Sequence, residues 1–141
     1  MTSNAILHPT VAMVAVTAIV WVRLLTDRVG EMRERRIPGQ AVATSRQIAE
    51  KLTHIQSADN FKNLFEMPVL FYALCLTLTV SQSATPMLVA GAWLFVGLRA
   101  LHSVIQCGYN RVNHRFAVYL ISSLLLFAMW GVFAVEIILV K

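Results

Sequence analysis

The sequence predicts an all-α membrane protein, built as a four-helix transmembrane bundle in a single domain that covers residues 1–141. Two properties of the chain predict this class. Hydrophobic residues make up 57% of it and charged residues only 13%, whereas soluble domains average about 25% charged residues. The charges are also clustered, because most of the Lys and Arg residues lie between positions 23 and 62.

Four apolar segments are each long enough to cross a bilayer, which takes about 20 residues of helix. We place these spans at residues 6–25, 60–80, 87–105 and 116–140. The long connection is the loop of residues 26–57, in which Pro38 and Gly39 interrupt helical structure. Beyond them, residues 45–56 are predicted to form a short surface helix.

Local signals support each span in turn. Pro9 suits the first turn of the first helix. The second span continues a polar helical segment that begins about a turn before it. Small polar residues at 81–86 predict a tight turn into the third span, and a short polar connection at 106–115 precedes the fourth.

The distribution of basic residues predicts the orientation of the chain. The first and third connections must lie on one side of the membrane, and with the adjoining helix ends they carry every Lys and Arg except Lys141. Cytoplasmic loops are enriched in Lys and Arg. Both connections are therefore predicted to face the cytoplasm and both termini to face away from it. The basic residues read as topology signals, and their arrangement does not predict nucleic-acid binding.

Polar side chains from three spans are predicted to meet in the cytoplasmic half of the bundle. Arg99 and His102 lie toward the end of the third span, and Arg115 opens the fourth. The spacing of the second-span residues by three and four predicts that they share one helix face; these are Asp59, Lys62, Asn63 and Glu66. Ionisable groups at membrane depth mark functional sites. The excess of cations predicts a pocket for a soluble ligand with a carboxylate, which Arg binds through paired hydrogen bonds.

The same residues also fit a structural interpretation. Lys62 or Arg99 can neutralise Glu66, and the group then acts as a polar clamp between helices, with contacts worth about 0.6–2 kcal/mol each. His102 alone is more typical of a packing hydrogen bond than of a catalyst. No spacing in the sequence is typical of a metal site.

Three short motifs occur in order along the spans. The second span carries Asn63, Glu66 and Pro68, the third carries an Arg-x-x-His motif that begins at Arg99, and the fourth opens at Arg115. Together they resemble the MAPEG family, the membrane-associated proteins of eicosanoid and glutathione metabolism, with a microsomal glutathione transferase-like character. The resemblance covers nearly the whole chain, including its length, its four spans and its basic first loop.

This resemblance implies a homotrimer of four-helix bundles that binds glutathione, as a co-substrate, between subunits at the cytoplasmic side. Arg115 is then the catalytic residue, because it holds the glutathione sulfur as a thiolate. The residues expected to bind glutathione or support its pocket are Lys62, Asn63, Glu66, Arg99, His102 and Tyr109. The implied activity is that of an integral membrane transferase or peroxidase, which acts on lipophilic electrophiles that arrive from the membrane lipids.

Two positions depart from the family pattern. Asp59 stands four residues before Asn63, where eukaryotic members often carry Arg, and Gln106 stands four residues after His102, where they often carry Tyr. The alternative function is therefore that of a non-catalytic member of the same fold, which binds a lipid or a protein partner. The compactness of the chain is typical of bacterial members and predicts the bacterial inner membrane as its location.

Overall fold

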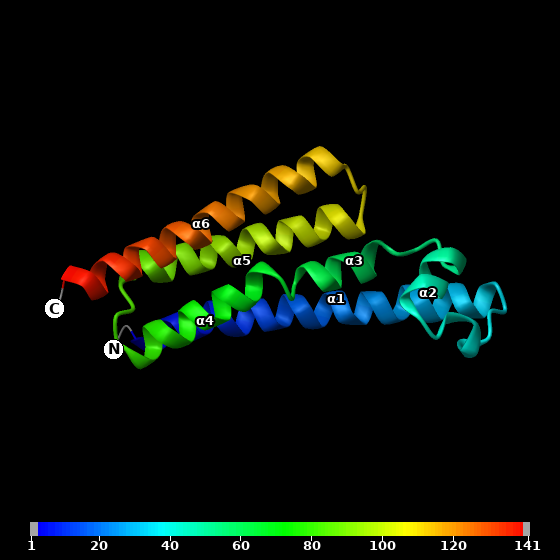
Figure 1. The fold of residues 1–141 in the computed structure, drawn as a ribbon, viewed down its shortest axis with the longest axis horizontal. Helices are drawn as coiled ribbons and strands as arrows, with labels where there is room; N and C mark the ends of the chain where they lie inside the picture. The colour runs from blue at the N-terminus through cyan, green and yellow to red at the C-terminus, as the bar shows by residue number, and fades with distance from the viewer. Residues whose placement is uncertain (1–2, 140–141) are drawn as a thin grey trace.

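The computed structural model describes residues 3–139, and every regular element in that part of the chain is helical. Four helical segments are long and apolar enough to cross a membrane, which confirms the predicted all-α fold with four spans. The predicted end of the fourth span at residue 140 lies outside the described residues, as does Lys141. In Figure 1 both termini lie at one end of the molecule. The two basic connections, residues 26–57 and 106–115, lie at the other end, which we refer to as the basic end.

The first span is part of a longer helix. A short 3-10 turn, η1 (Ser3–Ile6), leads into α1 (Leu7–Glu34). This helix continues past residue 25, so the first part of the predicted loop is helical. It ends where Arg36 adopts a left-handed φ of 53°, just before Pro38, whose ring cannot continue a helix.

The remainder of the long loop contains two short helices, η2 (Gly39–Val42) and α2 (Ser45–Lys51). Thr44 caps α2, because its hydroxyl accepts a hydrogen bond from the backbone N–H of Gln47 at 3.3 Å. Figure 1 shows α2 beside the far end of α1, at the basic end of the bundle.

The buried carboxylate of Glu31 fastens this loop to α1. It accepts hydrogen bonds from the backbone N–H groups of Thr53, at 2.8 Å, and His54, at 3.0 Å. Arg35 donates both to this carboxylate, at 2.8 Å, and to the backbone carbonyl of Lys51. Hydrogen bonds to an ionised group are the stronger kind, so the loop is held against the helix that precedes it.

The second span is interrupted. It consists of α3 (Gln56–Asn63) and α4 (Met67–Val80), separated by residues 64–66, which we refer to as the helix break. Pro68 explains the break, because it has no N–H to donate to the carbonyl four residues earlier and its ring obstructs that turn. Asp59, Lys62 and Asn63 lie on α3 at the predicted spacing, but Glu66 lies in the helix break. The prediction that all four share one helix face is therefore wrong for Glu66.

The last two spans form a helical hairpin. α5 (Pro86–Cys107) begins at Thr85, whose hydroxyl accepts from the backbone N–H of Leu88 at 3.3 Å. α6 (Val112–Leu139) then runs back beside α5, as Figure 1 shows. Asn110 makes the turn between them with a φ of 48°, a left-handed conformation that Asn tolerates better than most residues.

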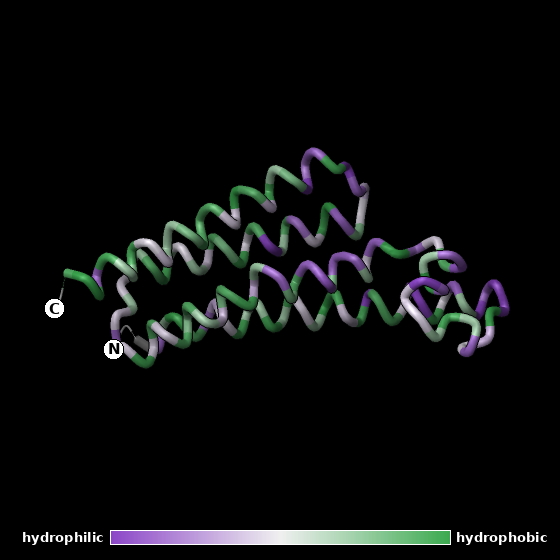
Figure 2. The backbone as a smooth tube through the Cα atoms, viewed as in Figure 1, coloured by the Kyte–Doolittle hydropathy of each residue, from purple (hydrophilic) through white to green (hydrophobic). Residues whose placement is uncertain are grey.

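The apolar core lies between α1, α4, α5 and α6, on the side of the helix break that leads to the termini. At its centre the rings of Phe71 and Phe95 stack with their centroids 4.7 Å apart. Figure 2 shows hydrophilic residues gathered at the basic end and hydrophobic residues along most of the bundle. The fold therefore places the polar residues of several helices at one end of an apolar bundle.

Candidate functional site

A row of polar contacts joins α3 to α5. Asn60 accepts a hydrogen bond from Ser103 Oγ at 3.3 Å and donates to Cys107 Sγ at 3.4 Å. One turn further on, Asn63 Nδ2 donates to Gln106 Oε1 at 3.0 Å. We refer to these contacts as the polar seam. Because each contact joins one turn of α3 to one turn of α5, the seam fixes the register of the two helices.

Arg99 bonds to a backbone carbonyl at the start of the helix break. Its Nη2 donates to the carbonyl oxygen of Asn63 at 2.9 Å, and its side chain is 0% exposed. The guanidinium carbon lies 5.5 Å from the centre of the Tyr119 ring. Non-helical backbone at membrane depth is tolerated only where protein or a cavity satisfies it. Arg99 therefore stabilises the break.

The same guanidinium has unused donors. Nε and Nη1 of Arg99 have no hydrogen-bond partner within residues 3–139. Buried donors of this kind almost always have a partner in a native protein, and a buried cation is costly unless an anion accompanies it. Arg99 is therefore suited to receive an anionic ligand.

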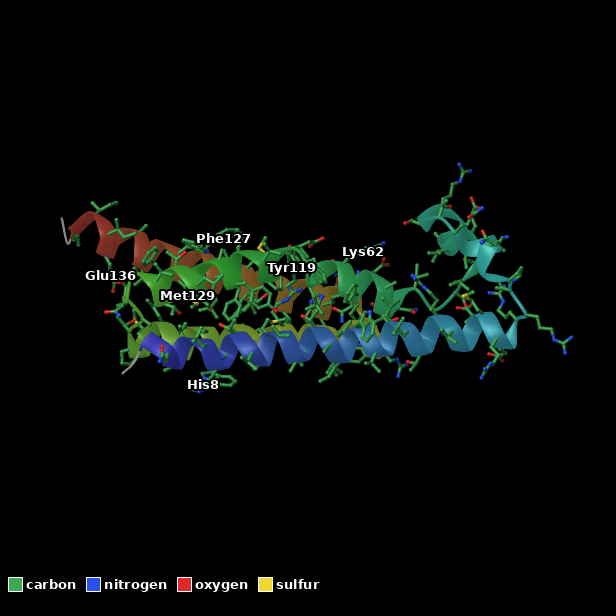
Figure 3. The ribbon with its side chains drawn as sticks, turned by 90° about the horizontal axis from the view of Figure 1, so that it is seen from below. His8, Lys62, Tyr119, Phe127, Met129 and Glu136 are labelled. Carbon is green, nitrogen blue, oxygen red and sulfur yellow. The ribbon has the colours of Figure 1, made fainter. Side chains whose placement is uncertain are left out.

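A cavity of about 210 Å³ lies beside the helix break. Its lining residues come from the second span, α5 and α6: Asn63, Glu66, His102, Val112, Arg115, Phe116 and Tyr119. We refer to it as the polar cavity. Figure 3 places Tyr119 along the bundle between Glu136, which lies toward the termini, and Lys62, which lies toward the basic end. Four residues predicted to form a site thus meet at this depth: Asn63, Glu66, His102 and Arg115.

The guanidinium of Arg115 is anchored at the edge of the polar cavity. Its Nη1 donates to Asn110 Oδ1 at 3.0 Å, and Asn110 is the residue that makes the left-handed turn before α6. The turn between the last two helices therefore determines where this cation lies. Within residues 3–139 the other N–H groups of the Arg115 guanidinium make no further hydrogen bond, so a ligand in the cavity can accept from them.

His102 connects α5 with α6. Its Nδ1 lies 3.1 Å from the backbone oxygen of Arg115 and its Nε2 lies 2.9 Å from Gln106 Oε1. The side chain is only 2% exposed, and its ring centre lies 6.0 Å from that of Tyr119. Because both ring nitrogens already have protein partners, His102 supports the cavity wall.

The structure does not bring Lys62 or Tyr109 to the polar cavity, and Arg99 contacts two of its lining residues without lining it. Lys62 Nζ lies 3.4 Å from Asp59 Oδ1 in an exposed pair, and both line a separate small cavity with Arg28. The hydroxyl of Tyr109 lies 3.1 Å from Nδ1 of His114, and Tyr109 is 59% exposed. A contact between glutathione and either residue stays a prediction.

Of the site residues that were not predicted from the sequence, Tyr119 and Gln106 are polar. Tyr119 lines the polar cavity and Gln106 bonds to two of its lining residues. Each lies one turn after a predicted residue, Tyr119 after Arg115 and Gln106 after His102. The i, i+4 spacing that places such pairs on one helix face was the signal for them.

A second, apolar cavity of about 440 Å³ adjoins the same helix break. α1 and the second span form it, and its lining residues are Val14, Thr17, Ala18, Trp21, Phe61, Leu64, Phe65 and Tyr72. We refer to it as the apolar groove. Leu64 and Phe65 belong to the break itself, and their neighbours Asn63 and Glu66 line the polar cavity. Four consecutive residues thus separate the polar cavity from the apolar groove.

These features define a multi-pass integral membrane protein in which one interrupted span lies between a polar cavity and an apolar groove. A model of the MAPEG family matches residues 6–135. The chain therefore belongs to the MAPEG family, as its three motifs predicted. No curated protein and no solved structure matches the chain.

Proposed function

We propose that this protein is a glutathione-dependent membrane enzyme of the microsomal glutathione transferase type. It conjugates glutathione to lipophilic electrophiles or uses it to reduce lipid hydroperoxides. The observation that carries this proposal is the helix break, since its residues line a charged cavity on one side and an apolar groove on the other. A reaction between a polar peptide and a lipophilic molecule needs two such compartments next to each other.

The charges around the polar cavity suit glutathione. Arg99 does not line the cavity, but it contacts Asn63 and Tyr119, which do. Its unused donors suit one of the carboxylates of glutathione, which Arg binds with paired hydrogen bonds. The carboxylate of Glu66 fits its ammonium group, and the side-chain amide of Asn63 fits one of its peptide groups. The ligand in turn supplies the anion that the buried Arg99 needs.

Arg115 has the catalytic role in this proposal. A free thiol has a pKa of about 8.5, so only a few percent of it is ionised at neutral pH. A guanidinium beside the sulfur lowers this pKa and favours the nucleophilic thiolate. The thiol proton passes to water. The sulfur electron pair then forms a bond to the electrophilic carbon, and the leaving group departs with its own electron pair.

The peroxidase reaction uses the same thiolate. The sulfur attacks the terminal oxygen of the hydroperoxide, and the O–O bond breaks with release of the alcohol. A second glutathione then displaces water from the oxidised sulfur and yields the disulfide. Two glutathione molecules are oxidised and one hydroperoxide is reduced, so no further reductant is needed.

A neighbouring subunit completes the proposed site. The polar cavity has a volume of about 210 Å³, which is smaller than the roughly 300–1,000 Å³ of most small-molecule sites. Glu66 lies at its exposed edge. A neighbouring subunit in a homotrimer closes this edge, with the basic end in the cytoplasm where glutathione is dissolved. The apolar groove receives the lipophilic co-substrate from the surrounding lipid.

Isothermal calorimetry on detergent-purified protein tests glutathione binding. Glutathione is expected to bind, and S-methylglutathione, which cannot form a thiolate, is the matched ligand that separates peptide binding from thiolate stabilisation. Arg99→Met, which keeps the length of the side chain but removes its donors, is expected to weaken both. The absence of any heat of binding at millimolar glutathione would contradict the proposal.

The non-catalytic alternative leads to a different result in a thermal melt. If the polar seam is only a clamp, Asn63→Ala lowers the melting temperature and glutathione leaves it unchanged. For the enzyme, excess glutathione raises the melting temperature by mass action, because it binds the folded state alone.

A further inference from the structure

The ring of His102 faces an oxygen atom on each side. Nδ1 lies 3.1 Å from the backbone oxygen of Arg115, and Nε2 lies 2.9 Å from the side-chain oxygen of Gln106. A neutral imidazole carries one N–H, and a carbonyl oxygen only accepts. One of these two contacts therefore lacks a hydrogen while His102 is neutral and Gln106 presents its oxygen.

A doubly protonated His102 is the less favourable solution. The side chain is 2% exposed and lies one turn after Arg99, which is itself fully buried. Arg115 adds another cation at the polar cavity, and Glu66 is the single carboxylate among the lining residues there. A further charge on the imidazole would have no anion of its own, and unpaired buried charges are costly.

A turned amide at Gln106 satisfies every contact with a neutral ring. The oxygen and nitrogen of an amide have nearly the same shape, so exchanging them changes no packing. The backbone carbonyl of Arg115 can only accept, so its contact with Nδ1 of His102 is a hydrogen bond only when Nδ1 carries the hydrogen. Nε2 is then an acceptor. The NH₂ group of Gln106 then donates one hydrogen to Nε2.

The same direction of donation continues from Gln106 to Asn63, which lines the polar cavity. The second hydrogen of the Gln106 NH₂ group points to the amide of Asn63, 3.0 Å away. The amide of Asn63, whose Nδ2 faces Gln106 in the structure, is then turned as well, so that its oxygen accepts from Gln106. Its own NH₂ group is then not used by Gln106, and Asn63 is one of the residues that line the cavity.

We propose that Gln106 is a positioning residue, which turns the amide of Asn63 so that it presents N–H donors to the polar cavity. The Arg115 carbonyl fixes the hydrogen of His102 on Nδ1, and His102 in turn fixes the orientation of the Gln106 amide. The benefit to catalysis rests on the proposed function, because the acceptor that Asn63 then binds belongs to glutathione. The direction of the hydrogen bonds is a property of the protein without any ligand.

The tautomer of His102 tests this direction by nuclear magnetic resonance. The triple variant His8→Gln, His54→Gln and His114→Gln leaves His102 as the one histidine of the chain. Long-range ¹H–¹⁵N correlation of this protein, labelled at histidine and held in detergent micelles without glutathione, distinguishes the two neutral tautomers from the imidazolium. We expect a neutral ring with its hydrogen on Nδ1. A hydrogen on Nε2, or a doubly protonated ring at neutral pH, overturns the proposal.

A second variant tests whether Gln106 controls that tautomer. Gln106→Glu replaces the donor with a group that only accepts when ionised, so the hydrogen is expected to move to Nε2 or the ring to become doubly protonated. Gln106→Met, which neither donates nor accepts strongly, is the matched control and leaves the hydrogen on Nδ1. An unchanged spectrum in Gln106→Glu contradicts the coupling. These measurements contain no glutathione, so they test the hydrogen-bond direction even if the protein does not bind glutathione.

Discussion

The two halves of the second span contact the rest of the bundle by different interactions. Toward the termini, α4 contributes fully buried apolar side chains, and Phe71 stacks on Phe95 at 4.7 Å. Toward the basic end, α3 packs through the polar seam, in which Asn60 and Asn63 bond to side chains of α5. Apolar packing stabilises a fold without specifying any ligand, whereas a polar contact orients groups in particular directions. Stability and function are thus expected to depend on different halves of one span.

The largest expected effect on stability lies in the apolar half. Phe71→Ala removes a fully buried ring that stacks on Phe95, and should lower the free energy of unfolding by about 3–5 kcal/mol. The affinity for glutathione of the protein that remains folded should not change. Phe65→Ala is the matched control, since Phe65 is 58% exposed. Equal losses from the two variants, measured by denaturant titration in detergent, would contradict the comparison.

Arg115→Ala should impair the stabilisation of the thiolate and leave the stability of the fold nearly unchanged. Without this cation the bound thiol returns toward its ordinary pKa, and each unit of that shift reduces the thiolate population about tenfold at neutral pH. The ultraviolet absorbance of bound thiolate should fall, while the free energy of unfolding changes little. Arg111→Ala removes an exposed Arg from the same connection and serves as the control. Thiolate absorbance that survives in Arg115→Ala removes Arg115 from the proposed role.

Asn63→Ala acts on both properties at once, because Asn63 belongs to the polar seam and also lines the polar cavity. We expect a loss of about 0.6–2 kcal/mol in the free energy of unfolding, the range for polar contacts between membrane helices, together with weaker glutathione binding. Asn113→Ala, at the exposed start of α6, is the control for both measurements. A loss of stability with unchanged affinity would favour the clamp over the ligand site.

Lys62→Ala should have the smallest effect. Its partner Asp59 is 3.4 Å away and both side chains are at least half exposed, so the pair is worth a few tenths of a kcal/mol. Calorimetry in the same detergent should give an unchanged glutathione affinity if each site is built from the polar cavity alone. A marked loss of affinity would show instead that Lys62 reaches a ligand held by another subunit.

The helix break is the main feature of the fold that the sequence did not predict. Pro68 is visible in the sequence, but proline is accepted in the first turn of a helix and within membrane helices. Whether the chain breaks there depends on a partner for the carbonyl groups that lose their helical bonds. That partner is Arg99, which comes from α5 and bonds to Asn63. A pattern confined to one span does not contain this information.

The sequence by itself determined the four helical spans and the family, because hydropathy summed over about 20 residues is a strong signal and the three motifs lie in order along the spans. It also placed the polar residues at one end of the bundle. Only the tertiary structure decided which of them face each other, leaving out Lys62 and Tyr109 and bringing in Gln106 and Tyr119. The physical reason is that residue spacing fixes a side chain's direction on its own helix, whereas its neighbours depend on how the other helices are rotated and where one of them breaks.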